Sequence, residues 1–213
     1  MSATRGALER LLNHIWYGDS LLSWCLIPLT WPVRWAIHHR RQQAAPKGST
    51  PAGVTVIVIG GLTAGGTGKT PVLIGLGKWL KEQGYRVGVV SRGYGGAHGP
   101  EPHSMTEVDT AAVVGDEPLL IQQALGVPVV VCTDRKRALD VLVDQGAVDV
   151  VLSDDGLQHY PMPRDIELLV LDAERGLGNG RLLPAGPLRE PASRLANVDV
   201  VLERNSSDPD RGF

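Results

Sequence analysis

Apolar residues beyond residue 50 fall into two kinds of segment, which alternate along the chain. Continuous runs rich in valine, isoleucine and leucine are typical of buried strands, and they lie at residues 54–59, 85–93, 127–132, 148–156, 165–173 and 198–204. Helical spacing of apolar residues predicts helices at residues 73–80, 116–125 and 134–146. The short run AAVVG, residues 111–115, is interpreted as one further strand.

This alternation predicts an α/β domain with a parallel sheet. Strands that are apolar throughout, rather than at every second residue, are buried on both faces. The helices between them are expected to cover the two faces of the sheet. Ligands of such sheets bind beyond the carboxyl ends of the strands, and the polar motifs described below all follow a predicted strand.

The first 47 residues have a different pattern. A helix is predicted from the helical spacing of Leu8, Leu11, Leu12, Ile15 and Trp16. The apolar run that follows covers only residues 21–33, whereas a membrane-spanning helix needs about 20 residues. Pro28 and Pro32 would also interrupt a spanning helix. Residues 42–53 form a polar linker that contains proline and glycine.

Basic and aromatic residues are concentrated in the same segment. Residues 1–47 hold six lysines and arginines against two acidic residues, and four of the five tryptophans. Tryptophan beside cations is typical of helices that lie on an anionic membrane surface. We therefore predict a membrane-surface helical anchor over residues 1–47. A transmembrane helix extending through Ile37, a cleaved signal peptide and helices packed on the protein's own core are the alternatives.

The composition of the whole chain limits the possible functions. The 213 residues carry a net charge of −2, with 43% hydrophobic and 21% charged residues, which is ordinary for a globular protein and argues against a nucleic-acid partner. The two cysteines, Cys25 and Cys132, are far apart and lack metal-ligand spacing. This cysteine usage suits a reducing compartment.

The strongest motif, TAGGTGKT, lies between the first predicted strand and a helix with Pro71 in its first turn. Glycines allow backbone N–H groups to turn toward an anion at a helix N-terminus. In such loops the lysine reaches the β- and γ-phosphates and the following hydroxyl ligates Mg²⁺. The motif departs from the strict pattern only at its first position. The predicted ATP-binding residues are Thr63, Ala64, Gly65, Gly66, Thr67, Gly68, Lys69 and Thr70.

Two adjacent carboxylates follow another predicted strand, in the segment VVLSDDGLQH. In a nucleotide-binding domain this is the position of an aspartate that holds Mg²⁺, directly or through water. Asp154 and Asp155 are therefore predicted, together with Thr70, to form the metal site. The alternative is a turn-forming Asp-Asp-Gly sequence. The fold expected from both motifs is a P-loop NTPase-like domain.

Further polar residues lie at other strand ends. Asp116 stands at a strand-to-helix corner, where it would act in chemistry or cap the helix. The basic residues would contact phosphate or simply solvate the surface, and a lone histidine is more often structural. The candidate substrate-binding residues are Arg92, Arg135, Arg137, Gln158, His159 and Arg189.

Five motifs in this order, TAGGTGKTP, SRGYGG, VGDEP, DDGLQH and LLPAGPLREP, resemble those of the tetraacyldisaccharide 4′-kinases, the lipid A 4′-kinases of Gram-negative bacteria. The apolar N-terminal segment with its trailing arginines also resembles theirs. The likeness covers nearly the whole chain. Even the threonine at position 63 is common at the start of the family's loop.

The resemblance implies transfer of the ATP γ-phosphate to the 4′-hydroxyl of a tetraacylated glucosamine disaccharide 1-phosphate, which gives lipid IVA. It implies that Asp116 acts on the acceptor hydroxyl and that Lys69, Asp154 and Asp155 serve the Mg²⁺–ATP site. It places the reaction at the cytoplasmic face of the inner membrane, where the enzyme would be peripheral or monotopic. The expected partners are the lipid A disaccharide precursor and an anionic membrane surface, with no nucleic acid and no protein partner.

The resemblance also suggests a domain organisation. Residues 48–213 would form the nucleotide-binding lobe, after the anchor at residues 1–47. Members of the family continue into a second α/β lobe that closes over the nucleotide and contributes a histidine that supports the catalytic aspartate. We therefore expect this chain to cover the first lobe only, without the second lobe of the family.

Two other functional classes remain open: a nucleotide-dependent switch and a non-catalytic nucleotide-binding protein. Membrane-bound ATPase switches use a K-G-G-x-G-K-[ST] loop, but Ala64 stands here in place of the signature lysine. A GTPase switch would need an N-K-x-D motif, which the sequence lacks. A non-catalytic nucleotide-binding protein is the second class. Consumption of ATP with and without a lipid acceptor would distinguish these classes.

Overall fold

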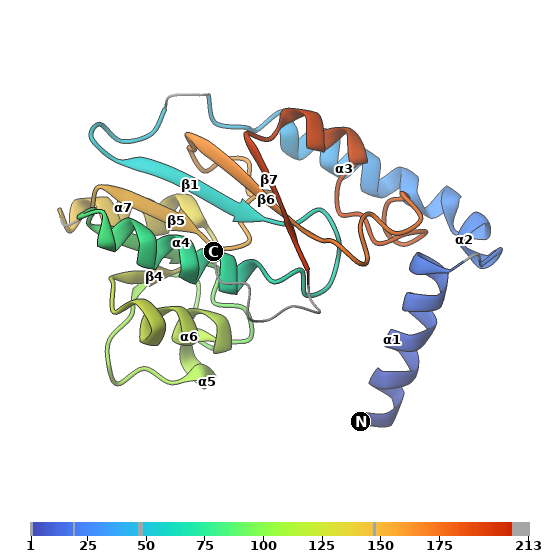
Figure 1. The fold of residues 1–213 in the computed structure, drawn as a ribbon, viewed down its shortest axis with the longest axis horizontal. Coiled ribbons are helices and arrows are strands. Elements are labelled where there is room, and N and C mark those ends of the chain that lie inside the picture. The colour runs from blue at the N-terminus through green and yellow to red at the C-terminus, as the bar shows by residue number, and fades with distance from the viewer. Residues whose placement is uncertain (1, 19, 47–48, 147, 206–213) are drawn as a thin grey trace.

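The computed structural model describes residues 2–18, 20–46, 49–146 and 148–205. A seven-stranded sheet forms its centre, in the order β3-β4-β2-β5-β1-β6-β7. The strands are β1 Thr55–Gly60, β2 Val87–Ser91, β3 His103–Ser104, β4 Val129–Val131, β5 Val150–Ser153, β6 Ile166–Asp172 and β7 Val200–Arg204. All neighbouring strands are parallel except β3 and β4, which confirms the predicted parallel α/β sheet (Figure 1).

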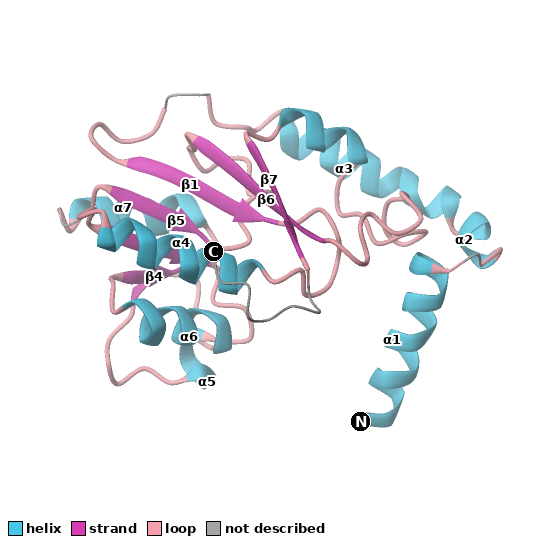
Figure 2. Ribbon diagram, in the orientation of Figure 1, coloured by secondary structure: helices cyan, strands magenta, loops and turns pink. Residues whose placement is uncertain are grey.

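Helices cover both faces of the sheet (Figure 2). They are α4 Lys69–Glu82, α5 Ala111–Val114, α6 Asp116–Leu125 and α7 Arg135–Asp144, with a 3₁₀ helix, η2, at Ala192–Asn197. Successive strand residues point to opposite faces. In β1, therefore, Val56 and Val58 enter the core that α7 covers, whereas Ile57 and Ile59 enter the core covered by α4 and α6.

The register of the central strands brings two of the predicted motifs together. Val58 of β1 is paired with Ser153, the last residue of β5. The chain after β5 therefore lies beside the end of β1, where the backbone N–H of Gly156 donates to the carbonyl of Ile59 at 3.1 Å. As a result, the Asp-Asp pair and the glycine-rich loop leave the same edge of the sheet.

The N-terminal segment forms four helical pieces: α1 Ser2–Tyr17, α2 Leu22–Cys25, the 3₁₀ helix η1 Ile27–Leu29, and α3 Thr30–Arg41. Figure 1 places α1 and α2 at the end of the molecule toward which β1 points. Part of this segment packs on the domain, because Ile15 is buried and the Trp16 indole donates to the carbonyl of Pro184 at 3.0 Å. In α3, by contrast, Trp31 and Trp35 are 73% and 70% exposed.

The sequence interpretation was wrong at residues 111–115. This apolar run forms helix α5 rather than a strand, with Gly115 at its C-terminal end. The sheet edge beside β4 is occupied by β3, which pairs antiparallel with it. The run of four apolar residues therefore does not pair with β4, and a single helical turn satisfies its backbone locally.

The two prolines divide the N-terminal apolar run as expected. Pro28 lies in η1, and Pro32 lies in the first turn of α3, where its missing N–H group costs nothing. In the part of the chain that the structure describes, no helix has both the length and the apolar character needed to cross a bilayer. Lys47 and residues 206–213 of the predicted domains lie outside the described residues.

Candidate active site

The glycine-rich loop joins the end of β1 to the start of α4. Gly65 and Gly68 have φ angles of 109° and 76°, in the region that glycine adopts most readily. Gly68 is the N-cap of α4, and no side chain caps the helix there. The first N–H groups of the helix are thus free to bind an anion. This geometry supports the predicted phosphate-binding loop.

The segment 182–191 holds this loop in place. Thr63 and Leu188 form an antiparallel bridge. The Arg189 N–H donates to the carbonyl of Leu62 at 2.7 Å, and the Ala64 N–H donates to the carbonyl of Pro187 at 2.8 Å. The backbone N–H of Ala64 is therefore engaged with the protein in this structure, which leaves the N–H groups from residue 65 onward as candidates for phosphate contact.

Asp155 is the point at which three predicted site residues meet. Its Oδ1 lies 3.5 Å from Lys69 Nζ, and its Oδ2 accepts a hydrogen bond of 2.8 Å from Arg189 Nη1. Burial opposes the charged form of Asp155, but the attraction of Lys69 and Arg189 outweighs it and lowers the pKa of this carboxyl. Asp155 is also the one residue other than glycine in the described chain with a positive φ, 45°.

Asp154 has a different environment, although it is the neighbour of Asp155. Its side chain is 2% exposed and accepts a hydrogen bond of 3.2 Å from Ser91 Oγ. Burial, with the negative charges of Glu117 and Asp155, raises the pKa of Asp154 to about 6. The pair thus combines one ionised carboxylate with one whose ionised form is costly near neutral pH.

Arg135 fixes the backbone of the Asp-Asp turn. Its buried guanidinium donates to the carbonyl of Asp154 at 3.1 Å and to that of Asp155 at 3.0 Å. Burial lowers the pKa of Arg135, while both aspartates raise it. Arg135 therefore orients the site through the backbone.

His159, another predicted site residue, lies beside an aspartate. Its Nε2 lies 3.3 Å from Asp134 Oδ1, and burial with the charge of Arg135 lowers the pKa of His159.

Gln158 links the site to a buried carboxylate that sequence reasoning missed. Its amide donates to the carbonyl of Gly61 and to Glu190 Oε1, each at 3.1 Å. Glu190 is 1% exposed and also accepts hydrogen bonds from Tyr160 and from Arg41 of α3. Glu190 therefore connects the N-terminal helices to the start of the phosphate-binding loop.

The contacts of Lys69, Asp155, Arg189 and Arg135 form one cluster. Three other predicted site residues lie outside it. Arg137 is exposed and pairs with Glu101. Arg92 is exposed at the end of β2, near enough to Arg135 for its charge to lower the pKa of Arg135. Asp116 is exposed as the first residue of α6, and Gly115, not Asp116, is the N-cap. Asp116 is thus accessible to a substrate, and the helix-cap alternative is wrong.

Two further charged residues lie beside the site although they were not among the predicted site residues. Glu117, beside Asp116, contributes to the raised pKa of Asp154. Arg204, at the end of β7, lies against the phosphate-binding loop, since a methyl group on Gly68 would lie 2.0 Å from Arg204 Nη1. Their position at strand and helix ends was a usable signal, because those ends meet at the ligand edge of the sheet.

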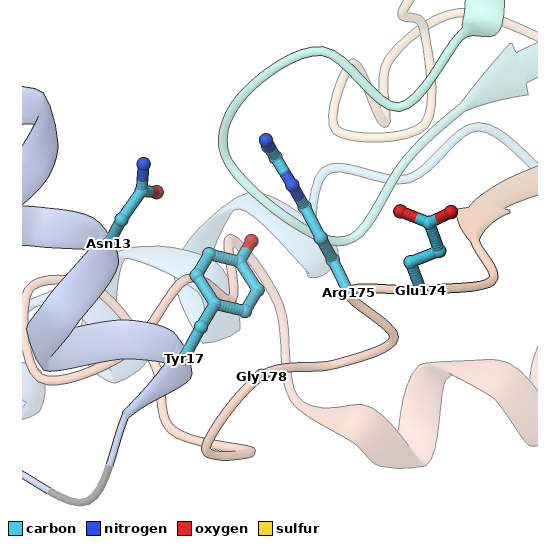
Figure 3. Close-up of a pocket in the computed structure, with 5 residues that line it drawn as sticks. All are labelled: Asn13, Tyr17, Glu174, Arg175 and Gly178. Carbon is cyan, nitrogen blue, oxygen red and sulfur yellow. The ribbon is translucent and has the colours of Figure 1, made fainter. Parts of the chain in front are cut away.

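A separate cleft of about 360 Å³ lies between α1 and the loop after β6 (Figure 3). Tyr17 and Arg175 stand beside each other there, with the guanidinium carbon 5.9 Å from the ring centroid. Burial raises the pKa of Tyr17. None of the predicted site residues lines this cleft, so the predicted site lies instead at the loop and the Asp-Asp turn.

Among the described residues, no group of three histidine, cysteine or acidic side chains is close enough to form a metal centre. The oxygens near the phosphate-binding loop include those of Asp155, which pairs with Lys69, and of the threonines in the loop itself. Asp155 Oδ1 and Thr67 Oγ1 are buried without a hydrogen-bond partner in the structure. Such oxygen atoms suit a hard cation that completes its coordination with phosphate and water.

Comparisons with known proteins place the chain in a family. The family model for tetraacyldisaccharide-1-P 4′-kinase matches residues 22–212. The chain is 45% identical over 198 residues to the tetraacyldisaccharide 4′-kinase of Legionella pneumophila (strain Corby), covering 90% of this chain and 59% of that relative. It is 49% identical over 208 residues to the corresponding protein of Pseudomonas fluorescens (strain Pf-5), covering 96% and 62%.

The fold is similar to the crystal structure of the apo form of LpxK from Aquifex aeolicus in complex with ATP. The TM-score is 0.75 and the identity 30%, and the match covers 91% of this chain and 61% of that one. The chain thus spans about 60% of the length of the relatives that it matches. Because the family model covers most of the sequence, the chain belongs to the tetraacyldisaccharide-1-P 4′-kinase family.

Proposed function

We propose that this chain carries the nucleotide site of a kinase that transfers the ATP γ-phosphate to the 4′-hydroxyl of a tetraacylated glucosamine disaccharide 1-phosphate. The product is lipid IVA, an intermediate of lipid A biosynthesis. The observation that carries the proposal is the meeting of Lys69 and Arg189 on Asp155, beside a glycine-rich loop and an uncapped helix N-terminus. The relatives are named for this acceptor, which supports the substrate class.

In the proposed mechanism the chain positions the reactants and stabilises charge, because phosphoryl transfer needs little covalent chemistry from the protein. The backbone N–H groups of residues 65–70 bind phosphate oxygens. Lys69 leaves Asp155 for the β- and γ-phosphates, and Arg189 balances charge at the transferring group. Asp116, exposed at the start of α6, orients or deprotonates the acceptor hydroxyl.

The donor set fits Mg²⁺. When bound, the ion would neutralise charge on the phosphates, which is its usual part in kinases. Thr70, Asp154 and Asp155 would hold it, and Asp155 Oδ1, which pairs with Lys69 but accepts no hydrogen bond, supports a place for the ion beside the nucleotide. Mg²⁺ is typically held by one or two carboxylates plus substrate phosphates.

We further propose that residues 1–47 lie on the cytoplasmic face of the inner membrane and that residues 48–213 form the kinase lobe. The exposed Trp31 and Trp35 support membrane contact by one face of α3. The buried Ile15 and the hydrogen bond of Trp16 support attachment of a different helix, α1, to the lobe. Membrane contact and packing on the lobe are therefore proposed for different helices of one segment. A lipid with four acyl chains remains in the bilayer, so the site must reach the membrane surface.

The test is transfer of the labelled γ-phosphate of ATP, with Mg²⁺, to the tetraacylated acceptor in mixed micelles. Lipid-bound label that requires both the acceptor and Lys69 is expected. Release of free phosphate without any need for the acceptor would identify an ATPase switch instead. Nucleotide binding without either product would identify a binding protein. Arg137→Gln is a matched control, because Arg137 pairs with Glu101 and lies outside the cluster.

A further inference from the structure

A small cleft separates the N-terminal helices from the segment that follows β6. Its walls include Ile27, Thr30 and Arg34 on one side, and Gly180, Arg181 and Leu182 on the other. The volume is about 250 Å³, below the roughly 300–1,000 Å³ of sites that enclose a whole small-molecule ligand. The cleft therefore suits a small headgroup whose remaining atoms stay outside.

The charge of the cleft is entirely positive. Arg34 and Arg181 both line it, and none of its lining residues is acidic. Other arginines of this region, such as Arg41 and Arg189, form ion pairs with carboxylates at 2.9 and 2.8 Å. Within the described part of the chain, neither Arg34 nor Arg181 has such an ion pair. Two guanidinium groups without a counter-ion favour an anion with several acceptor oxygens.

Arg181 is held in a fixed position. Its Nη1 donates to the buried Ser23 Oγ at 2.6 Å, and its guanidinium carbon lies 3.9 Å from the centre of the Trp24 ring. One side of the planar group is thus bound to α2, while its other N–H groups are available to a ligand. A guanidinium that is already oriented loses little conformational entropy on binding phosphate.

Large exposed apolar side chains belong to the helices that form one wall of the cleft. Trp24 is 62% exposed, Leu29 55% and Trp31 73%. Trp31 lies one turn before Arg34 on α3, and Trp24 stacks on Arg181. A cationic cleft between exposed aromatic and aliphatic side chains matches the profile of a lipid, which has a charged headgroup joined to hydrocarbon.

We infer that this cleft binds the phosphate of an anionic membrane phospholipid, with the Arg34 and Arg181 guanidinium groups on its oxygens. The acyl chains would lie along Trp24, Leu29 and Trp31. A phosphate held there would connect the N-terminal helices to the segment that supports the phosphate-binding loop. The inference rests on the proposed membrane association of residues 1–47, and it replaces diffuse attraction to the membrane with one defined site.

The first test uses a soluble, short-chain phosphatidylglycerol below the concentration at which it aggregates. Tryptophan fluorescence reports binding, because Trp24 stacks on Arg181. Saturable binding of one phosphatidylglycerol is expected, with at least about tenfold weaker binding of the phosphatidylcholine of the same chain length. Inorganic phosphate at the same concentration is expected to compete poorly, because it lacks the apolar contacts.

The second test compares matched arginine variants of the full chain. Arg34→Gln and Arg181→Gln are each expected to weaken phosphatidylglycerol binding about tenfold or more, since each removes charged hydrogen bonds. Arg40→Gln removes a charge from the same helix, and Arg175→Gln removes an arginine that likewise stacks on an aromatic ring. Neither control residue lines the cleft, and each is expected to change binding less than about twofold in 0.15 M salt.

Three results would overturn the inference. Equal weakening by all four variants would mean diffuse electrostatic attraction. Complete competition by inorganic phosphate would mean a free-phosphate site. Displacement of the short-chain lipid by the disaccharide acceptor in neutral micelles, lost in Arg34→Gln, would assign the cleft to the acceptor's own phosphate. These binding assays contain no ATP, so failure of the cleft and failure of the proposed phosphoryl transfer are separate results.

Discussion

The raised pKa of Asp154 predicts that Asp154→Asn makes the protein more stable at alkaline pH. Burial, with the charges of Glu117 and Asp155, raises this pKa from 3.8 to about 6. Between these pH values the folded state keeps a proton that the unfolded chain has released. The unfolded state then binds fewer protons, so the free energy of unfolding falls as pH rises. The difference in pKa corresponds to about 3 kcal/mol above pH 7.

Asparagine removes the charge and keeps an oxygen that accepts the hydrogen bond of Ser91. Urea unfolding of the parent and of Asp154→Asn at pH 4, 6 and 8 tests the reasoning. The two proteins are expected to differ little at pH 4. At pH 8 the variant is expected to be more stable by up to about 3 kcal/mol, with most of the change between pH 4 and 6.

Asp149→Asn is a control of opposite sign. Hydrogen bonds from Arg86 lower the pKa of Asp149 to about 2, so its contribution to stability is present above pH 4 and is lost as the pH falls toward 2. Asp149→Asn is therefore expected to be less stable than the parent at pH 6 and 8. A pH-independent difference for Asp154→Asn, or a loss of stability at pH 8, would refute the assigned environment of Asp154.

Three further predictions address the proposed roles. Lys69→Ala is expected to lower phosphoryl transfer by at least about 100-fold, a far larger effect than its effect on the free energy of unfolding, measured by single turnover and urea unfolding. Trp31→Ser with Trp35→Ser is expected to abolish sedimentation with anionic vesicles at unchanged stability; unchanged sedimentation would argue against membrane contact by α3. Asp155→Ala is expected to weaken Mg²⁺–ATP binding, whereas Asp116→Ala should lower kcat by roughly 10²–10⁴-fold at unchanged ATP affinity. Transfer at the parent rate by Asp116→Ala would place the base elsewhere.

Most of the fold could be predicted because its signals are local. Continuous valine and isoleucine runs produced the parallel strands, and the glycine-rich loop lies where strand and helix periodicities meet. The strand predicted at residues 111–115 was wrong because the deciding contact is not local. A run of four apolar residues fits either a helical turn or a strand, and the choice depended on whether the edge beside β4 was free. That edge is occupied by β3, His103–Ser104, whose two residues gave no strand pattern.

The site was predictable only in part, because some of its contacts join residues that are far apart in the sequence. Strand ends identified Lys69 and Asp155, because parallel strands bring their carboxyl ends to one edge. Glu190 is different, since its burial depends on hydrogen-bond donors that lie 30, 32 and 149 residues away in the sequence. A buried carboxylate is tolerated only when such partners surround it. Only Arg194, whose Nε lies 3.6 Å from Glu190 Oε2, is close to Glu190 in the sequence.

The basic residues of the N-terminal segment do not all serve one purpose. Their number and their tryptophan neighbours predicted a membrane surface, which treats them as equivalent. In the structure, Arg41 donates to the buried Glu190 at 2.9 Å, and Glu190 in turn accepts from Gln158, which also bonds the carbonyl of Gly61. Arg41 therefore belongs to the chain of contacts that supports the phosphate-binding loop, while Arg34 stays exposed without a carboxylate partner among the described residues. Under the proposed function, membrane attraction and support of the phosphate-binding loop fall to different arginines of one helix, and substitution of each should affect only one of these properties.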